Sequence, residues 1–432
     1  MDSFKPTKYR IESLLSGSTC EDSNWILEMP DDEKPALIRA RYANKQLRLK
    51  NPKFGLYQFA DWLPIKRILE NSSAPITYKS EMLAQKLGLQ NLHITFSGYF
   101  PEKGATMRTC SFKETEAYSV CARLSDEQLN NVLVVASAGN TARAFAQVCS
   151  DNNIKLLLCV PEDNIESLWF EKPLNKCVKL IVTKSGSDYF DAIHLSNIVC
   201  GFEGFFPEGG AKNIARRDGM ATTMLSATTS IGHIPDYYFQ AIGSGTGAIA
   251  AWEANLRLLE DGRFGNNKMR LLLSQNKPFL PIYEAWKQQS REMLPYDSDQ
   301  ARCDASKIDA KVLSNRKPPY ALVGGLFDAL TDTKGAIYAI SNEEARVAGE
   351  LFEQLEGIDI HPAAAVATAS LIQAVENGAI DNHSRIMLNI TGGGEKRFKS
   401  DRELFFLKPD IVFETNAEAD LIASEIAEKL HF

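Results

Sequence analysis

The chain is predicted to be an α/β protein whose twisted, parallel-rich sheets carry helices on both faces. From residue 132 onward, short aliphatic runs alternate with stretches of helical period. Strands that alternate with helices favour parallel sheets, because each crossover helix packs back onto the sheet that it connects. A length of 432 residues is enough for two or three domains.

Hydrophobic period and turn residues mark the individual elements. Pro35 would lie in the first turn of a helix over 31–47, and Gly88 would close a helix over 81–87. Ile422, Ile426 and Leu430 recur every four residues, which indicates a helix face packed on the core. Further helices are expected at 114–124, 141–149, 165–170, 189–199, 214–231, 248–259, 343–356, 363–377 and 418–430. Strands are expected at 75–78, 92–96, 132–136, 155–160, 178–182, 204–206, 237–242, 269–273 and 385–390. The polar segment 296–319 should run over the surface.

Composition and charge exclude several classes of protein. With 44% hydrophobic and 24% charged residues the chain has the composition of a globular protein. A net charge of -7 gives no electrostatic reason to expect nucleic acid or an anionic membrane as a partner. The eight cysteines form no CxxC pair and no Cys/His cluster, so we expect reduced thiols and no metal. We find no signal-peptide pattern and no membrane-spanning segment, and we expect a cytoplasmic protein.

Lys113 is the first candidate for a catalytic residue. It follows a Ser-Phe pair at the point where an irregular segment ends and a helix is expected to begin. Ser111 and Glu114 fit a capping box, which would fix the helix start and hold the lysine in a defined place. Such a lysine could hold an aldehyde cofactor as a Schiff base. The alternative is a solvated lysine at an ordinary helix start, and only the later motifs favour the chemical interpretation.

Three strand-to-loop junctions carry further candidates. At Ala136-Ser137-Ala138-Gly139-Asn140-Thr141, small residues let the backbone approach a ligand, the helix start favours a carboxylate, and the Asn140 amide could bond a ring oxygen. At Thr391-Gly392-Gly393-Gly394, the hydroxyl could face a pyridine nitrogen while the glycines leave room for a flat ring. Taken singly, each could be an ordinary turn.

The third junction is Gly243-Ser244-Gly245-Thr246-Gly247, which precedes a helix. Its successive N–H groups and two hydroxyls form a cradle for a phosphate. The loop lacks the GK[ST] ending of a nucleotide P-loop. It satisfies a GxGxxA dinucleotide pattern through Ala248, but the following strand runs into Ser274-Gln275-Asn276 rather than the acidic residue that a ribose requires.

Together these motifs occur in the order and context of the fold type II pyridoxal-phosphate enzymes. The chain resembles the threonine synthase and cysteine synthase superfamily from about residue 62 to 397, through SFKE, SAGNT, GSGTG and TGGG. The run 357–367 is similar to the threonine synthase segment before its late helix. Within the superfamily the chain most closely resembles the cysteate synthases, in the stretches 74–81, 96–104, 109–114, 210–220, 238–247 and 318–320. It departs from archaeal members in its first segment, where Cys20 stands alone instead of a cysteine-bearing leader, so the acceptor could differ.

The resemblance implies pyridoxal 5'-phosphate as the cofactor and a tryptophan synthase β-like fold of two domains. Lys113 is implied as the catalytic residue and covalent anchor. The implied cofactor-binding residues are Lys113, Asn140, Gly243, Ser244, Gly245, Thr246, Gly247 and Thr391. The implied substrate-binding residues are Ser137, Ala138, Gly139 and Thr141. A large domain (1–115, with an N-terminal extension, and 206–432) and a small domain (116–205) should close over the ligands.

A polar and cationic cluster follows Gly209-Gly210. From it we take Asn213 and Arg216 as substrate-binding candidates for a leaving phosphate or an incoming sulfite. Lys212 and Arg217 belong to the same cluster, and Lys103 and Arg108 are weaker candidates. The alternative for all of them is a solvated helix start or loop. We assign no role to His361.

The expected reaction is loss of phosphate from O-phospho-L-serine and addition of sulfite to the resulting aminoacrylate, which gives L-cysteate. A hydroxyl at Thr391, unlike a carboxylate, would not keep the pyridine protonated, which suits elimination and replacement at the β carbon. Threonine synthase activity on O-phosphohomoserine with water, or β-replacement with another nucleophile in a specialised pathway, stays open. Two alternatives lie outside this class: a ligand-binding homologue without catalytic activity, and an enzyme that binds a nicotinamide cofactor. Members of the resembled family are usually homodimers, so the resemblance implies that this protein is a homodimer.

Overall fold

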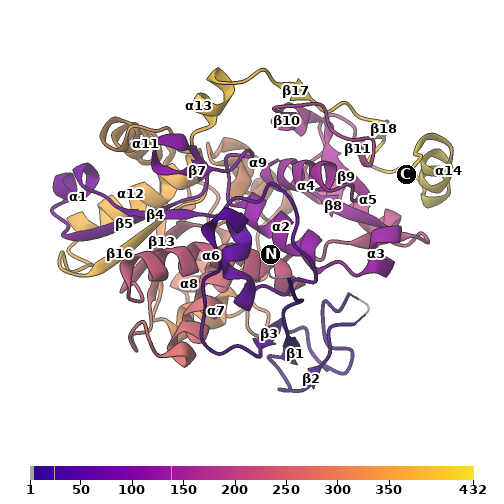
Figure 1. Cartoon of the computed structure of the whole chain (residues 1–432). Coiled ribbons are helices and arrows are strands. Elements are labelled where there is room, and N and C mark those ends of the chain that lie inside the picture. Colours follow the sequence, from indigo (N-terminus) through magenta and orange to yellow (C-terminus); the bar gives the residue numbers. More distant parts are fainter. Residues whose placement is uncertain (1–3, 24, 138) are drawn as a thin grey trace.

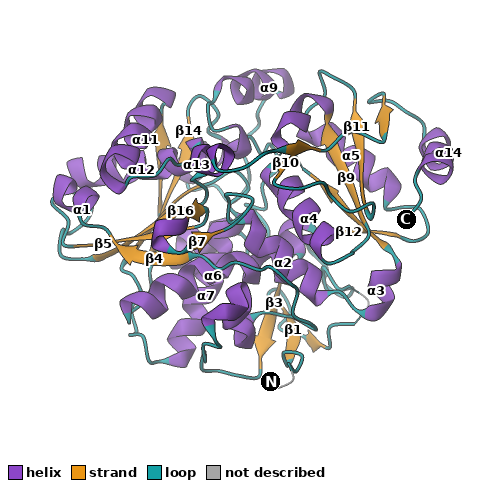
Figure 2. Cartoon of the chain, turned by 45° about the horizontal axis from the view of Figure 1, so that its top comes forward, coloured by secondary structure: helices purple, strands orange, loops and turns teal. Residues whose placement is uncertain are grey.

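Two sheets organise the chain, as the computed structural model shows for residues 4–23, 25–137 and 139–432 (Figures 1 and 2). The six-stranded sheet has the order β15 (Ala336–Ile340), β14 (Arg270–Asn276), β13 (Tyr237–Ala241), β16 (Arg385–Ile390), β5 (Asn91–Phe96) and β4 (Ile76–Lys79). Its strands are parallel except for β4, which runs antiparallel to β5. The predicted α/β class is therefore confirmed.

The second sheet has five parallel strands. Their order is β12 (Phe205–Pro207), β8 (Val132–Ala136), β9 (Leu156–Pro161), β11 (Val178–Thr183) and β18 (Ile411–Phe413). The last of these comes from the end of the chain. It is followed by α14 (Ala419–Lys429), whose stripe Ile422, Ile426 and Leu430 is buried in the core of this sheet, as its period predicts. The division into domains at 116–205 and 206–432 stays a prediction.

Helices fill the space between the sheets and cover them (Figure 2). Near the centre, α2 (Lys113–Arg123) packs on α6 (Ile214–Ile231) and on α4 (Asn140–Asp151), and α6 packs on α7 (Thr246–Asp261). The other helices are α1 (Met82–Leu87), α3 (Asp126–Asn130), α5 (Tyr189–Val199), α8 (Pro281–Lys287), α9 (Ser298–Lys307), α10 (Leu326–Asp332), α11 (Asn342–Glu356), α12 (Pro362–Glu376) and α13 (Glu395–Ser400). Two short strands, β6 (Tyr99–Phe100) and β7 (Ala105–Thr106), pair with each other. Within the described residues, no helix combines the length and apolar character that crossing a membrane requires.

The predicted helix over 31–47 is wrong. This segment contains β3 (Ile38–Tyr42), which pairs antiparallel with β1 (Tyr9–Ser13), beside β2 (Thr19–Cys20). No helix begins near Asp32, whose carboxylate accepts a hydrogen bond from the Ser13 hydroxyl (2.6 Å) beside β1. Tertiary pairing with β1 therefore overrides the local helix-start signal.

One other local expectation is corrected in part, and a second is confirmed with more detail. A 3-10 helix covers Glu162–Ser167, but the segment 165–170 ends in the strand β10 (Trp169–Phe170), which pairs with β17 (Phe405–Phe406). The segment 296–319 is mostly exposed or half-buried, as predicted, and it includes the helix α9, which begins at an Asp297 cap. Both depend on partners or caps that the hydrophobic period does not report.

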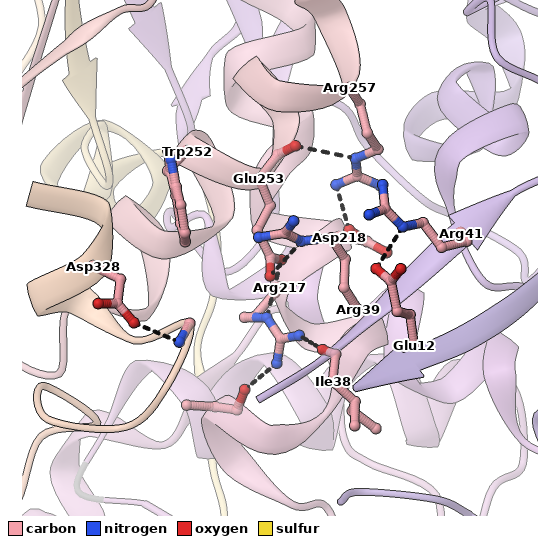
Figure 3. A network of polar contacts seen from close by, with 12 residues as sticks. Glu12, Ile38, Arg39, Arg41, Arg217, Asp218, Trp252, Glu253, Arg257 and Asp328 are labelled. Carbon is pink, nitrogen blue, oxygen red and sulfur yellow. Dashed lines mark hydrogen bonds and ion pairs between the residues drawn. The ribbon is translucent and has the colours of Figure 1, made fainter. Parts of the chain in front are cut away.

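A buried ionic network fastens the N-terminal sheet to α6 and α7 (Figure 3). The Glu253 carboxylate of α7 accepts from Arg217 Nε (3.0 Å) on α6 and from Arg39 Nε (3.3 Å) on β3. Arg217 also donates to the Ile38 carbonyl, and Arg257 donates to Asp218. Since a buried charge without its partner is costly, these pairs fix the relative positions of β3, α6 and α7.

Asp22 and Trp25 form a second attachment, at the end of α2. The Arg123 guanidinium is 1% exposed and donates to both Asp22 carboxylate oxygens (2.7 and 2.8 Å). Trp25 covers it, with the guanidinium carbon 4.8 Å from the ring centroid, and donates its indole N–H to the Pro207 carbonyl (2.8 Å). The N-terminal segment thereby holds α2 against the end of β12.

Replacing Gly219 by alanine should loosen the packing of α2 on α6. A methyl group there would lie 2.4 Å from the Thr115 carbonyl oxygen of α2, so one helix must shift. We expect destabilisation of about 1–3 kcal/mol, measured as a lower midpoint of urea unfolding. Gly349→Ala in α11 is the matched control, since its methyl meets only the Ala365 side chain at 3.2 Å. Equal midpoints for Gly219→Ala and wild type would show that this close approach is not needed.

Replacing Asp22 by asparagine should leave Arg123 as a buried cation without a counter-charge, at a cost of roughly 3 kcal/mol near neutral pH. Burial alone would raise the pKa of Asp22, but Arg123 holds it below its ordinary value. A depressed carboxyl pKa contributes stability above the unfolded value of about 3.9, and this contribution is lost as pH falls through the folded value. Urea midpoints of wild type and Asp22→Asn should therefore converge below about pH 4. Asp126→Asn, at a 98% exposed partner of Arg67, is the control and should change little.

Candidate active site

Lys113 begins α2, and the chain before it is held by the segment after β16. The Phe112 N–H donates to the Thr391 carbonyl (2.9 Å), and the Gly393 N–H donates to the Cys110 carbonyl (3.1 Å). The expected capping box is wrong, since the Ser111 hydroxyl has no partner among the described residues. Glu114 instead accepts from the Thr109 N–H (2.9 Å) and hydroxyl (3.0 Å), which still fixes the turn before Lys113.

The Lys113 amine lies in a cluster of charged side chains centred on Glu116. One Glu116 oxygen accepts from Lys113 Nζ (3.2 Å) and Arg216 Nε (3.1 Å), and the other accepts from Arg216 Nη2 (2.8 Å) and the Thr141 hydroxyl (3.0 Å). Arg216 Nη1 donates to Glu208 (2.7 Å). The structure thus brings together three of the predicted residues, Lys113, Thr141 and Arg216.

Burial and charge set the ionisation of this cluster. Burial lowers the pKa of Lys113, and the Arg216 charge lowers it further, while Glu116 opposes the shift. Burial alone would raise the pKa of Glu116, but Arg216 and Lys113 outweigh it and hold that pKa below its ordinary value. A lysine with a lowered pKa is more often neutral, which is the form that attacks a carbonyl group.

The loop before α4 reaches the same cluster. Asn140 is the first residue of α4, and its amide oxygen accepts from Arg143 Nη2 (2.9 Å). The Gly139 N–H donates to the Ser137 hydroxyl (3.1 Å). Ala138 lies outside the described residues. The backbone and amide groups of this loop are thus presented at the start of a helix, on the side where Thr141 contacts Glu116.

The glycine loop from Gly243 to Gly247 joins β13 to α7, a sixteen-residue helix. Its two hydroxyls, of Ser244 and Thr246, lie 2.9 Å apart. Side chains are excluded at both ends, because a methyl at Gly243 would lie 2.9 Å from Leu313 Cα, and one at Gly247 would lie 2.7 Å from Gln240 Nε2 and 3.2 Å from a Phe112 ring carbon. The loop therefore lies next to the residue that precedes Lys113, and its small residues leave backbone N–H groups at a helix start.

Close contact also explains the glycines after Thr391. A methyl at Gly392 would lie 2.3 Å from His361 Nδ1, and one at Gly394, where φ is +73°, would lie 1.8 Å from the Tyr99 carbonyl oxygen. The His361 ring in turn contacts Glu395 (Nε2 to Oε2, 2.9 Å). The segment can therefore run directly against residues 110–112, which brings Thr391 to the Lys113 end of α2.

The remaining polar and cationic candidates contact parts of the chain other than Lys113. Asn213 is 0% exposed, and its amide accepts from Arg123 Nη1 (2.9 Å) and donates to the Glu208 carbonyl (2.7 Å). These contacts tie Asn213 to Arg123 and Glu208, and its expected contact with the substrate stays a prediction. Arg217 belongs to the network of Figure 3, and Lys212 pairs with Glu28 at the surface. Arg108 is held by Asp151 and Glu171, and Lys103 lies over the Tyr78 ring.

Sequence reasoning missed the carboxylates of the cluster. Glu116 carries a local signal, because it lies three residues after Lys113 on the same helix face. Glu208, just after β12, carries none, since only the fold brings it to Arg216. Tyr189, at the start of α5, is also near, and the charges of Arg216, Glu208 and Glu116 affect its pKa, which burial raises.

The arrangement fits a small phosphorylated aldehyde. A lysine amine with a lowered pKa can hold the aldehyde, and the glycine cradle beside Phe112 can hold the phosphate. Among the residues that the structure describes, no group of three His, Cys, Asp or Glu side chains could hold a metal ion.

Comparisons with known proteins agree with this chemistry. The family described as "Pyridoxal-phosphate dependent enzyme" matches residues 102–392. The chain is 50% identical to "Cysteate synthase" of Methanosarcina acetivorans over 87% of this chain and 90% of that protein. It is 48% identical to the protein of the same name from Methanocella arvoryzae over 93% and 95%.

Solved structures show the same fold. Maize serine racemase superposes with a TM-score of 0.59 at 16% identity, covering 74% of this chain and 88% of that one. Threonine deaminase isoform 2 from Solanum lycopersicum superposes with a TM-score of 0.54 at 16% identity, covering 76% and 87%. The chain therefore belongs to the fold type II pyridoxal-phosphate-dependent enzymes, in the same family as its cysteate synthase relatives, and its cofactor is pyridoxal 5'-phosphate.

Proposed function

We propose that the enzyme makes L-cysteate from O-phospho-L-serine and sulfite. The bond between the β carbon and the phosphate oxygen breaks, a bond between the β carbon and sulfur forms, and phosphate leaves. Relatives at 46–50% identity that carry the name cysteate synthase support this reaction. The observation that carries the proposal is the shared Glu116 carboxylate, which keeps the Arg216 guanidinium beside the Lys113 amine. Leaving group and nucleophile are both anions, and a guanidinium suits both.

Different residues would hold the cofactor and move the proton. When bound, pyridoxal phosphate supplies a ring that withdraws electrons from the α carbon of an amino acid. Lys113 would hold the aldehyde, and its neutral amine would afterwards accept the α proton at Nζ. Asn140 and Thr391 would contact the ring, and the loop from Gly243 to Gly247 would bind the cofactor phosphate.

The substrate would be held by its two charged ends. The loop from Ser137 to Thr141 presents backbone groups at the start of α4, where a carboxylate is favoured. Arg216 would bind the phosphate and then sulfite. Because the buried Glu116 fixes two donors of Arg216, the guanidinium needs little further ordering when the anion binds.

A homodimer and a cytoplasmic location belong to the same proposal and rest on the resemblance alone. The competing reactions in this class are threonine formation from O-phosphohomoserine and water, and β-replacement with another nucleophile. The names of the relatives favour sulfite over both.

Replacing Lys113 by alanine should abolish covalent attachment of the cofactor. Wild type incubated with pyridoxal phosphate and reduced with borohydride should carry the cofactor on the peptide that contains residue 113, as identified by mass spectrometry. Lys113→Ala should carry none and should lose activity. The Lys212→Met variant is the control, since Lys212 pairs with Glu28 and is 42% exposed. Labelling of another lysine in the wild type would contradict the role of Lys113.

The reaction is tested by giving the protein each phospho-amino acid with and without sulfite and identifying the amino acid formed. We expect L-cysteate and phosphate only from O-phospho-L-serine with sulfite. Arg216→Lys should lower kcat/KM on the order of 100-fold, because a lysine cannot make the paired contacts of a guanidinium. Lys212→Met should keep wild-type kcat/KM. Threonine from O-phosphohomoserine would overturn the cysteate proposal.

A further inference from the structure

Glu208 is the least satisfied group of the charged cluster. Its Oε2 accepts from the Gly210 N–H (2.9 Å) and from Arg216 Nη1 (2.7 Å). Its Oε1 is buried and has no hydrogen-bond partner among the described residues. Burying a charged carboxylate oxygen without a partner costs free energy, and a proton on Glu208 would lower that cost.

The groups that face Glu208 come from three helices. Arg216 belongs to α6, Glu116 and Lys113 belong to α2, and Tyr189 begins α5. Burial raises the pKa of Glu208, and the neighbouring Glu116 carboxylate raises it further, while Arg216 and Lys113 oppose the shift. Glu208 is therefore easier to protonate than Glu116, whose pKa is lowered and whose two oxygens accept four hydrogen bonds.

A bound anion would leave the cluster with more negative than positive charge. Two carboxylates, Glu116 and Glu208, face Arg216, which is a permanent cation, and Lys113, whose lowered pKa makes its amine more often neutral. The cations keep 22% and 13% of their side chains exposed, against 0% and 6% for the carboxylates. A phosphate or sulfite anion would thus meet the cations from the solvent side and would add negative charge close to both buried carboxylates. Like charges at such distances in a poorly solvated site are not all retained.

We propose that Glu208 takes up one proton from solvent when a phosphate-like or sulfite-like dianion binds at Arg216. Neutralising Glu208 releases Arg216 Nη1 for the anion and removes the nearest repelling charge. The protonated carboxyl also gains a donor, which an anion can use as a hydrogen-bond partner. Glu208 is thereby a specificity-determining residue, since a neutral substrate group would not draw the proton. The inference depends on the proposed function only through anion binding by Arg216.

Proton uptake by Glu208 makes the dissociation constant of the anion depend on pH. Below the pKa of Glu208 in the free protein the proton is already present, and anion binding needs no uptake. Above it, each bound dianion must bring a proton, so the dissociation constant should rise about tenfold per pH unit. Anion binding therefore weakens as pH rises.

Isothermal titration of sulfate into the cofactor-loaded protein tests this, since sulfate does not itself titrate near neutral pH. Repeating the titration in buffers of different ionisation enthalpy counts the protons bound. Wild type should take up close to one proton per sulfate above the pKa of Glu208. Glu208→Gln, which imitates the neutral carboxyl, should bind sulfate with no proton uptake and with a dissociation constant independent of pH. Glu28→Gln is the matched control on a carboxylate that is 58% exposed and pairs with Lys212, and it should behave as wild type.

Three outcomes would overturn the inference: no sulfate binding to wild type, binding without proton uptake, or undiminished uptake by Glu208→Gln. The wild-type proton count stands by itself if Glu208→Gln folds poorly. Failure of the proposed function would look different. Proton-linked sulfate binding that depends on Glu208, together with no cysteate from phosphoserine, would leave this inference in place and remove only the assigned reaction.

Discussion

The site depends on one buried carboxylate. Glu116 accepts hydrogen bonds from Lys113, from Arg216 and from Thr141, which come from α2, α6 and α4. Its own side chain is completely buried, and it stays charged because Arg216, together with Lys113, holds its pKa below the ordinary value. The contacts that offset the cost of burying Glu116 also hold an amine and a guanidinium side by side. A covalent anchor and an anion-binding group are thereby fixed relative to each other before any ligand arrives.

The scaffold keeps these three helices in register. Gly219 lets α6 approach the backbone of α2, and the pairs around Glu253 hold α6 and α7 to the N-terminal sheet. Asp22 holds Arg123 at the far end of α2, and Arg123 in turn holds Asn213 just before α6. The N-terminal extension is thus connected to the site through α2 and α6. Its effect on the reaction would come through the position of Lys113 and Arg216.

Backbone rather than side chains forms the remaining walls. The residues after Thr391 are hydrogen-bonded to 110–112, and a Cβ atom would lie 2.3 Å from the His361 ring at Gly392 and 2.7 Å from the Gln240 amide at Gly247. Glycine is required there because these neighbours approach too closely for any side chain. The consequence is that two loops from the six-stranded sheet meet the start of α2, where N–H groups and hydroxyls remain available to a cofactor.

The sequence alone determined the alternation of strands and helices, and with it the α/β class, because buried strands and amphipathic helices have short periods that neighbouring residues reveal. It also identified Lys113 and the loops at 137–141, 243–247 and 391–394, since small residues and glycines at strand ends are local signals. Tertiary structure decided what those signals could not. Residues 38–42 of the segment 31–47 form a strand because β1 pairs with them. Asn213 lies in the scaffold because Arg123 donates a hydrogen bond to it. Glu208 lies in the site because β12 ends beside α6. Such partners lie from eight to about a hundred residues apart, so no local pattern encodes them.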